Sequence, residues 1–136
     1  MTCRCAVVAV VDDDHRILES IQGLLESAGL TVRLYSAAKP FLEARDLADI
    51  EVLISDIGMP DMDGHELKRI VQSERPNLPV ILLTGRDDAL WAQSSIAAHG
   101  YQNFFRKPFS GRELLAAIEI ALQSRAEDRP AVSRRR

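Results

Sequence analysis

The chain has 136 residues, of which 46% are hydrophobic and 27% charged, so it can bury one sizeable core but is too short for two ordinary domains. Its formal net charge of -3 argues against a surface built mainly to bind nucleic acid or anionic lipid, because such binding needs clustered lysine and arginine. No stretch reaches the length of a membrane span, and the first apolar run ends in three acids and not in a signal cleavage site, so we expect a cytoplasmic protein.

Five short apolar runs predict β-strands, since each is too short for a helix and most are rich in Val, Ile, Leu or aromatic residues. They are Ala6–Val11, Thr31–Tyr35, Val52–Ser55, Val80–Leu83 and Asn103–Phe105. Longer segments between them carry apolar residues at helical spacing. These stripes are Ile17, Leu18, Ile21, Leu24 and Leu25, and then Leu67, Ile70 and Val71. The alternation predicts an α/β fold, a doubly wound parallel sheet with helices on both faces.

The last predicted helix begins at a capping box, Ser110 followed by Glu113, and continues in an apolar stripe. The stripe consists of Leu114, Leu115, Ile118 and Leu122. We expect this helix to end near Ser124, because the remaining stretch, "RAEDRPAVSRRR", is charged and interrupted by proline. The sequence thus predicts one domain over residues 1–124 and a charged tail or linker stub over residues 125–136.

Side chains suited to chemistry stand where the predicted strands end. Asp12 and Asp13 follow the first strand, Asp56 the third, Thr84 the fourth and Lys107 the fifth. Ligands of such folds bind beyond the carboxyl ends of the strands, so these residues can share one rim. Neighbouring carboxylates repel one another unless a cation joins them, and all-oxygen ligation with open positions suits Mg²⁺. A hydroxyl and an ammonium at the same rim suit a phosphoryl group.

Three further acids near these strand ends are interpreted as structural. Asp14 is more typical of the cap of the first helix than of a metal ligand. Asp61 and Asp63 belong to the stretch "PDMDG", which is ordinary turn chemistry and lacks the repeated acids of a calcium-binding loop.

Four motifs occur in the order "VVDDD", "LISDIGMPDMDG", "VILLTG" and "FFRKPF". They resemble the receiver domain of two-component response regulators, and the resemblance extends from about Val7 to Leu122. The stretches "YSAAKPFL" and "VILLTG" are most similar to receivers of the nitrogen-fixation regulator type. The resemblance implies a five-stranded, flavodoxin-like sheet with the strand order 2-1-3-4-5.

The resemblance also implies a phosphoacceptor and a metal site. Asp56 would take a phosphoryl group from a histidine kinase or a phosphotransfer protein. Asp13 would bind Mg²⁺ directly, Asp12 would act on it largely through water, and Asp56 would complete the acidic ligands. Gly58 would offer its backbone carbonyl to the metal.

Two further residues would bind the phosphoryl group, and one would transmit its presence. Thr84 would hydrogen-bond one phosphoryl oxygen, and Lys107 would pair with another. Phe104 stands where the family has an aromatic residue that switches together with Thr84, and without a hydroxyl it would switch by packing alone. A downstream protein partner, or a DNA-binding output domain missing from this chain, would receive the signal. The resemblance allows a homodimer and implies no direct binding of this domain to nucleic acid or membrane.

Haloacid-dehalogenase-type phosphatases are the main alternative, because they also use a strand-end Asp, a Thr or Ser, a Lys and Mg²⁺. Those phosphatases carry a second Asp two residues after the nucleophile as general acid and base, and here that position is Gly58. A binding module that no longer accepts phosphate is disfavoured, since the acids, Thr84 and Lys107 are all present. We therefore expect a regulatory domain and not an enzyme, apart from its own Mg²⁺-dependent phosphorylation and dephosphorylation.

Overall fold

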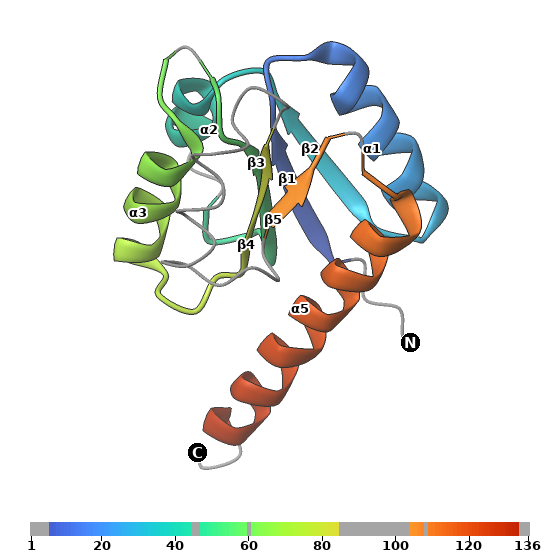
Figure 1. Cartoon of the computed structure of the whole chain (residues 1–136). Helices are drawn as coiled ribbons and strands as arrows, with labels where there is room; N and C mark the ends of the chain where they lie inside the picture. The colour runs from blue at the N-terminus through green and yellow to red at the C-terminus, as the bar shows by residue number, and fades with distance from the viewer. Residues whose placement is uncertain (1–5, 45–46, 60, 85–103, 108, 134–136) are drawn as a thin grey trace.

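The structure, a computed structural model, describes residues 6–44, 47–59, 61–84, 104–107 and 109–133 (Figure 1). The strands are β1 (Val7–Val11), β2 (Thr31–Tyr35), β3 (Val52–Asp56), β4 (Val80–Thr84) and β5 (Phe104–Arg106). The helices are α1 (His15–Ser27), α2 (Ala38–Ala44), α3 (Gly64–Glu74) and α5 (Gly111–Ser133). Strand and helix alternate from β1 to β4, as the apolar runs predict, and α5 follows β5.

The strands lie side by side in one parallel sheet, in the order β2-β1-β3-β4-β5 (Figure 1). β1, β3 and β4 occupy the middle of the sheet, and β3 and β4 are buried along their whole length. Strands covered on both faces must be apolar at successive positions, which explains the runs of Val, Ile and Leu. The predicted α/β fold with a parallel sheet is therefore confirmed.

Helices cover both faces of the sheet and create two separate cores. Phe41 of α2 and Leu67 and Val71 of α3 pack in one core with alternate residues of the strands. Leu18, Ile21 and Leu25 of α1 and Leu114 and Ile118 of α5 pack in the other core. The predicted stripes of these helices thus supply most of the helical contacts with the sheet, although Ile70 of α3 is 37% exposed. Helices on both faces are confirmed.

Polar side chains begin three of the described helices, and the sequence predicts two of these caps, Asp14 and Ser110. Asp14 accepts a hydrogen bond from the backbone N–H of Arg16 at 2.9 Å, and Asp63 accepts one from that of Glu66 at 2.9 Å. The hydroxyl of Ser110 accepts one from the N–H of Glu113 at 3.3 Å. These bonds satisfy N–H groups that have no partner inside a helix.

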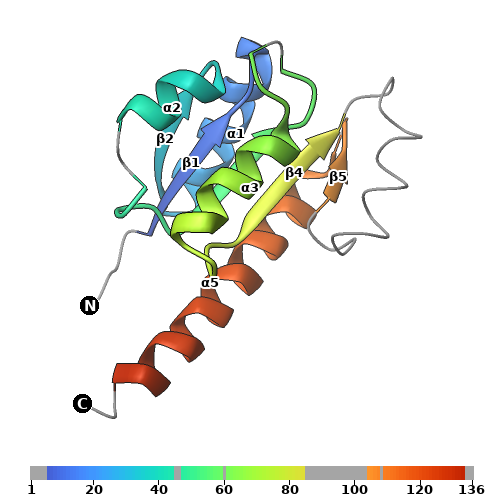
Figure 2. The same ribbon diagram turned by 90° about the vertical axis from the view of Figure 1, so that its left-hand side faces the viewer.

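The end of α5 differs from the prediction. The helix was expected to end near Ser124, but it continues to Ser133, and its C-terminal half extends away from the sheet in both views (Figures 1 and 2). Arg125, Ala126 and Glu127 are strong helix formers, and their propensity outweighs the interruption expected from Pro130. None of the helices in the described ranges is long and apolar enough to cross a membrane.

Gly64 begins α3 at a point where the helix touches the end of β3. A Cβ atom on Gly64 would lie 2.7 Å from the backbone oxygen of Asp56 and 3.0 Å from the Cα of Ile57. Because backbone atoms cannot move aside as a flexible side chain can, we expect Gly64→Ala to lower the free energy of unfolding by about 2 kcal/mol. Urea denaturation would measure this loss.

Gly23→Ala is the matched control for Gly64→Ala. Gly23 lies in α1, and a Cβ atom there would meet nothing within 4 Å. Alanine is the better helix former, so this substitution should stabilise the protein by up to about 1 kcal/mol. Equal effects of the two substitutions would contradict the close approach of α3 to β3.

Candidate functional site

The carboxyl ends of the strands meet at one edge of the sheet. Val11, the last residue of β1, is level with Ser55 of β3, and Asp56 is level with Leu83 of β4. Thr84 is in turn level with Arg106 of β5. Asp12 and Lys107 directly follow β1 and β5. The parallel register therefore gathers residues that are far apart in the sequence.

Lys107 connects two of the acids. Its Nζ lies 2.9 Å from Oδ2 of Asp12 and 3.1 Å from Oδ1 of Asp56. Its backbone N–H donates to the carbonyl of Thr84 at 2.8 Å, which fixes the lysine next to the end of β4. The Lys107 side chain is 19% exposed, whereas the side chains of Asp12 and Asp56 are 0% and 8% exposed. The ammonium thus compensates two carboxylates that have lost most of their hydration.

Burial and this ion pair act against each other on the acids. Burial raises the pKa of Asp12 above its usual value, although the N–H of Asp14 and the ammonium of Lys107 favour the charged form. Burial likewise raises the pKa of Asp56, opposed by Lys107 and by a hydrogen bond from the backbone N–H of Gly58, and assisted by the charge of Asp13. Among the described residues, three carboxylates thus stand beside one ammonium, that of Lys107.

The same interactions act on Lys107 with the opposite sign. Burial by itself would lower the pKa of the ammonium, but hydrogen bonds and attraction from Asp12 and Asp56 outweigh it, so the pKa of Lys107 is raised. This lysine is held in its charged form through the whole physiological pH range.

Three carboxylates form the candidate metal site. One oxygen from each of Asp12, Asp13 and Asp56 lies within 4.8 Å of the others, and Asp13 is exposed while the other two are buried. Oδ2 of Asp12 has no donor among the described residues other than the ammonium of Lys107. Clustered carboxylate oxygens that open to water on one side fit a hard divalent cation, which keeps part of its water shell. The donor set thus fits Mg²⁺.

The structure describes the side chains of most of the other predicted residues, but only the backbone of Phe104. Gly58 is exposed on the loop after Asp56, beside the carboxylate to which its N–H donates. Thr84 ends β4 and is 3% exposed. The backbone of Phe104 pairs with Leu82, but its side chain lies outside the described residues. Asp14 caps α1, as interpreted from the sequence, whereas Asp63, which was interpreted as a turn residue, caps α3.

Sequence reasoning missed two residues that shape this edge of the sheet. Asp61 was interpreted as a turn residue, but its carboxylate accepts hydrogen bonds from the start of α2. Gly64 was given no role, although it allows α3 to approach the end of β3. A glycine at the first position of a helix was the available signal, because glycine is a poor helix former and is often retained there for close packing.

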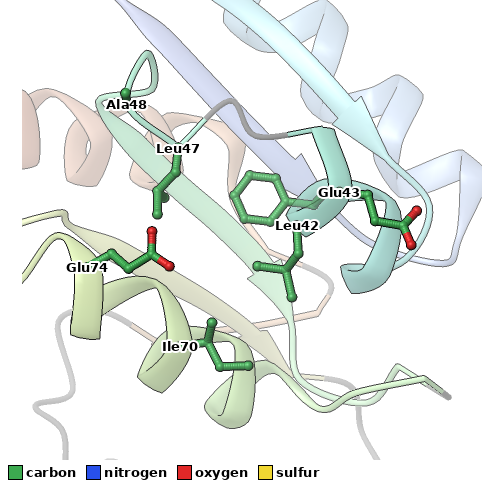
Figure 3. Close-up of a pocket in the computed structure, with 7 residues that line it drawn as sticks. Leu42, Glu43, Leu47, Ala48, Ile70 and Glu74 are labelled. Carbon is green, nitrogen blue, oxygen red and sulfur yellow. The ribbon is translucent and has the colours of Figure 1, made fainter.

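A groove of about 630 Å³ lies between α2 and α3, apart from the strand-end acids. Its lining is mainly apolar and consists of Phe41, Leu42, Glu43, Leu47, Ala48, Ile70 and Glu74. In Figure 3 the carboxylate of Glu74 lies near Leu47, whereas that of Glu43 points away from the other lining side chains. The groove shares no residue with the acidic cluster, so it is not part of the candidate metal site.

The raised pKa of Asp56 makes the stability of the metal-free protein depend on pH. A carboxyl group whose pKa is raised on folding holds its proton more tightly in the folded state, so its contribution declines as pH rises from 3.8 through the folded pKa. We therefore expect Asp56→Asn, without metal, to raise Tm by a few degrees at neutral pH. The difference should disappear below about pH 4.

Melting curves in chelator across this pH range would measure the effect. Asp49→Asn is the matched control, because Asp49 is 66% exposed and pairs only loosely with Arg33, at 3.8 Å. A Tm for Asp56→Asn at or below that of the wild type at neutral pH would show that burial does not destabilise the charged form of Asp56.

Comparisons with known proteins agree on one family. Residues 8–119 match the family model described as "Response regulator receiver domain". The chain is 36% identical over 129 residues to the response regulator protein TodT of Pseudomonas putida, which covers 95% of this chain and 56% of TodT. It is 34% identical over 116 residues to the transcriptional regulatory protein FixJ of Bradyrhizobium diazoefficiens, which covers 85% of this chain and 56% of FixJ.

A solved structure gives the same result for the fold. The crystal structure of a response regulator receiver domain protein from Clostridium thermocellum matches with a TM-score of 0.78 and 30% identity, over 89% of this chain and 97% of that one. The chain thus spans just over half the length of the curated relatives above, while it matches nearly the whole of an isolated domain.

Proposed function

Since the chain belongs to the response regulator receiver domains of two-component signalling, we propose that Asp56 accepts a phosphoryl group from a phosphohistidine. The observation that carries this assignment is the ammonium of Lys107, which lies 3.1 Å from Oδ1 of Asp56 and 2.9 Å from Oδ2 of Asp12. A fixed cation beside a buried carboxylate, with two more acids within ligand distance, is what transfer to a carboxylate requires.

The transfer exchanges one bond to phosphorus for another. A carboxylate oxygen of Asp56 attacks phosphorus opposite the histidine nitrogen and forms a P–O bond. The P–N bond breaks, and its electron pair stays on the imidazole. Such in-line transfer depends mainly on positioning and on compensation of charge.

Each residue at the rim has a separate part in this transfer. The carboxylates of Asp12, Asp13 and Asp56, with the carbonyl of Gly58, would hold Mg²⁺, which would supply positive charge next to the phosphoryl oxygens. Lys107 pairs with a phosphoryl oxygen once Asp56 carries the phosphoryl group as an acyl phosphate. Thr84 hydrogen-bonds another phosphoryl oxygen.

Phosphorylation is then read out through a switch and an output partner. Thr84 moves toward the phosphoryl group, and Phe104 repacks behind it. The partners are a histidine kinase or phosphotransfer protein on the input side, and a downstream protein or a DNA-binding output domain on the other. The length of the relatives supports such an output, since this chain spans 56% of TodT and of FixJ, which is named a transcriptional regulatory protein.

The proposal makes this chain a cytoplasmic regulatory module and not a metabolic enzyme. Residues 1–124 would form the receiver domain, and residues 125–136 a charged tail or linker stub, of which the part up to Ser133 continues α5. The phosphatase alternative has no support among the relatives, which are response regulators, and Gly58 stands where its general acid would be.

The direct test is incubation with acetyl phosphate, with and without Mg²⁺. Intact-protein mass spectrometry should show one added phosphoryl group only when Mg²⁺ is present. A protein that remains unmodified with acetyl phosphate and with a range of phosphorylated histidine kinases would contradict the proposal.

A further inference from the structure

The loop between β3 and α3 connects the proposed acceptor Asp56 to the cap residue Asp63. Ile57 and Met59 of this loop are 3% and 5% exposed and pack in the core on the α2 and α3 face. The N–H of Ile57 donates to the carbonyl of Leu83 at 2.9 Å, and the N–H of Gly64 donates to that of Ile57 at 3.0 Å. The first part of the loop is thus fixed to both β4 and α3.

Asp61 fixes the other part of the loop to a different helix. Its Oδ2 accepts a hydrogen bond from the backbone N–H of Lys39 at 2.9 Å, and its Oδ1 accepts a longer one from that of Ala38 at 3.4 Å. These amides begin α2, and Lys39 is 22 residues away from Asp61 in the sequence. A carboxylate suits this position because the first N–H groups of a helix lack partners and carry partial positive charge.

Two aspartates of one loop therefore hold the starts of two helices. Asp63 caps α3 through the N–H of Glu66, and Asp61 crosses to α2. Gly58 lies between the buried residues Ile57 and Met59, and its N–H donates to the carboxylate of Asp56. Gly58 is thus held by these neighbours on one part of the loop, and the contact of Asp61 with α2 holds the part that follows.

We propose that Asp61 is a positioning residue for the metal site, which holds the loop against α2 and so keeps the Gly58 carbonyl in place to bind Mg²⁺. This inference rests on the proposed function, in which that carbonyl is a ligand. Asp61 itself lies outside the ligand cluster and acts only through the loop. Without the two hydrogen bonds of Asp61, the loop samples positions in which the Gly58 carbonyl is displaced. The affinity of the protein for Mg²⁺ then falls, because only part of the population is ready to bind it.

The experiment compares the Mg²⁺ dissociation constants of three variants with that of the wild-type chain by isothermal titration. Asp61→Ala should weaken Mg²⁺ binding about tenfold, the low end for residues that orient metal ligands. Asp61→Asn keeps an oxygen for the shorter bond to Lys39 and should stay within about threefold of wild type. Asp49→Ala removes another exposed acid, one that contacts Arg33 and not the loop, and should leave the affinity unchanged.

A purely structural role would lower Tm in Asp61→Ala without changing the dissociation constant, and that result would overturn the inference. Equal weakening by Asp61→Ala and Asp61→Asn would also overturn it, because lost charge and not lost positioning would then be the cause. Amide hydrogen exchange gives a second measurement. Faster exchange in Asp61→Ala at Gly58 as well as at Lys39 supports the inference, and faster exchange at Lys39 alone contradicts it.

Phosphorylation of the wild type separates this inference from the proposed function. If the wild type binds Mg²⁺ but Asp56 never accepts phosphate, the proposed function fails, while the comparison of dissociation constants still tests Asp61. If Asp56 is phosphorylated and Asp61→Ala binds Mg²⁺ as the wild type does, only the role of Asp61 fails.

Discussion

Replacing Asp56 with asparagine is expected to abolish phosphoryl incorporation from acetyl phosphate in the presence of Mg²⁺. Asparagine has nearly the same shape but no anionic oxygen to attack phosphorus, so the loss should be complete and not partial. Asp56 is also one of three carboxylates within ligand distance of one another, so the substitution weakens the metal site at the same time. Intact-protein mass spectrometry, followed by mapping of the modified peptide, would measure it.

Asp49→Asn controls for the loss of one negative charge. The side chain of Asp49 is 66% exposed, and it pairs with Arg33 and not with a residue of the acidic cluster. That variant should be phosphorylated as the wild type is. Undiminished incorporation in Asp56→Asn would mean that another residue accepts the phosphoryl group, with exposed Asp13 as the first candidate to map.

The second large effect concerns Lys107→Ala. This substitution removes the only cation that an ion pair joins to Asp12 and Asp56 among the described residues. Loss of one partner from a buried pair leaves the other charges uncompensated, so the metal-free protein should lose about 2–3 kcal/mol of unfolding free energy. Mg²⁺ should restore part of this stability by neutralising the same carboxylates.

Lys107→Ala should also greatly lower the rate of phosphorylation. With saturating Mg²⁺, the rate of incorporation should fall about 100-fold, the usual cost of removing one group that stabilises charge in a transition state. Lys39→Ala is the matched control, because Lys39 is exposed and contributes only its backbone N–H to the contacts described. A Lys107→Ala protein that reacts at the wild-type rate would remove this lysine from the mechanism.

Local physical chemistry explains why the strands and helix starts could be predicted. Residues of β3 and β4 are buried on both faces, and no sequence can fill such strands without a continuous apolar run. Asp14 and Ser110 could be recognised as caps because a cap bonds to amides only two or three residues away. In each case the pattern that permits the prediction lies within one short segment of the sequence.

The prediction failed where long-range or competing effects decide. The end of α5 was placed at Ser124 because proline and charge suggested a break, but the helix continues to Ser133. Asp61 was interpreted as a turn residue. Its contact with Lys39 could not be predicted, because it joins segments 22 residues apart. The tight approach of Gly64 to Asp56 depends on where α3 packs against the sheet, and no pattern in one segment specifies that.

Apolar patterning alone was enough to predict which residues stand at the ends of the strands, and so which side chains could meet: Asp12, Asp13, Asp56, Thr84 and Lys107. This was possible because a buried strand stops where its apolar run stops. The folded arrangement was needed to establish that Lys107 joins Asp12 and Asp56 at 2.9 and 3.1 Å, and that Asp61 holds the loop between β3 and α3 to the start of α2. Those distances follow from the parallel register of the strands and from helix packing, in which every segment of the chain takes part at once.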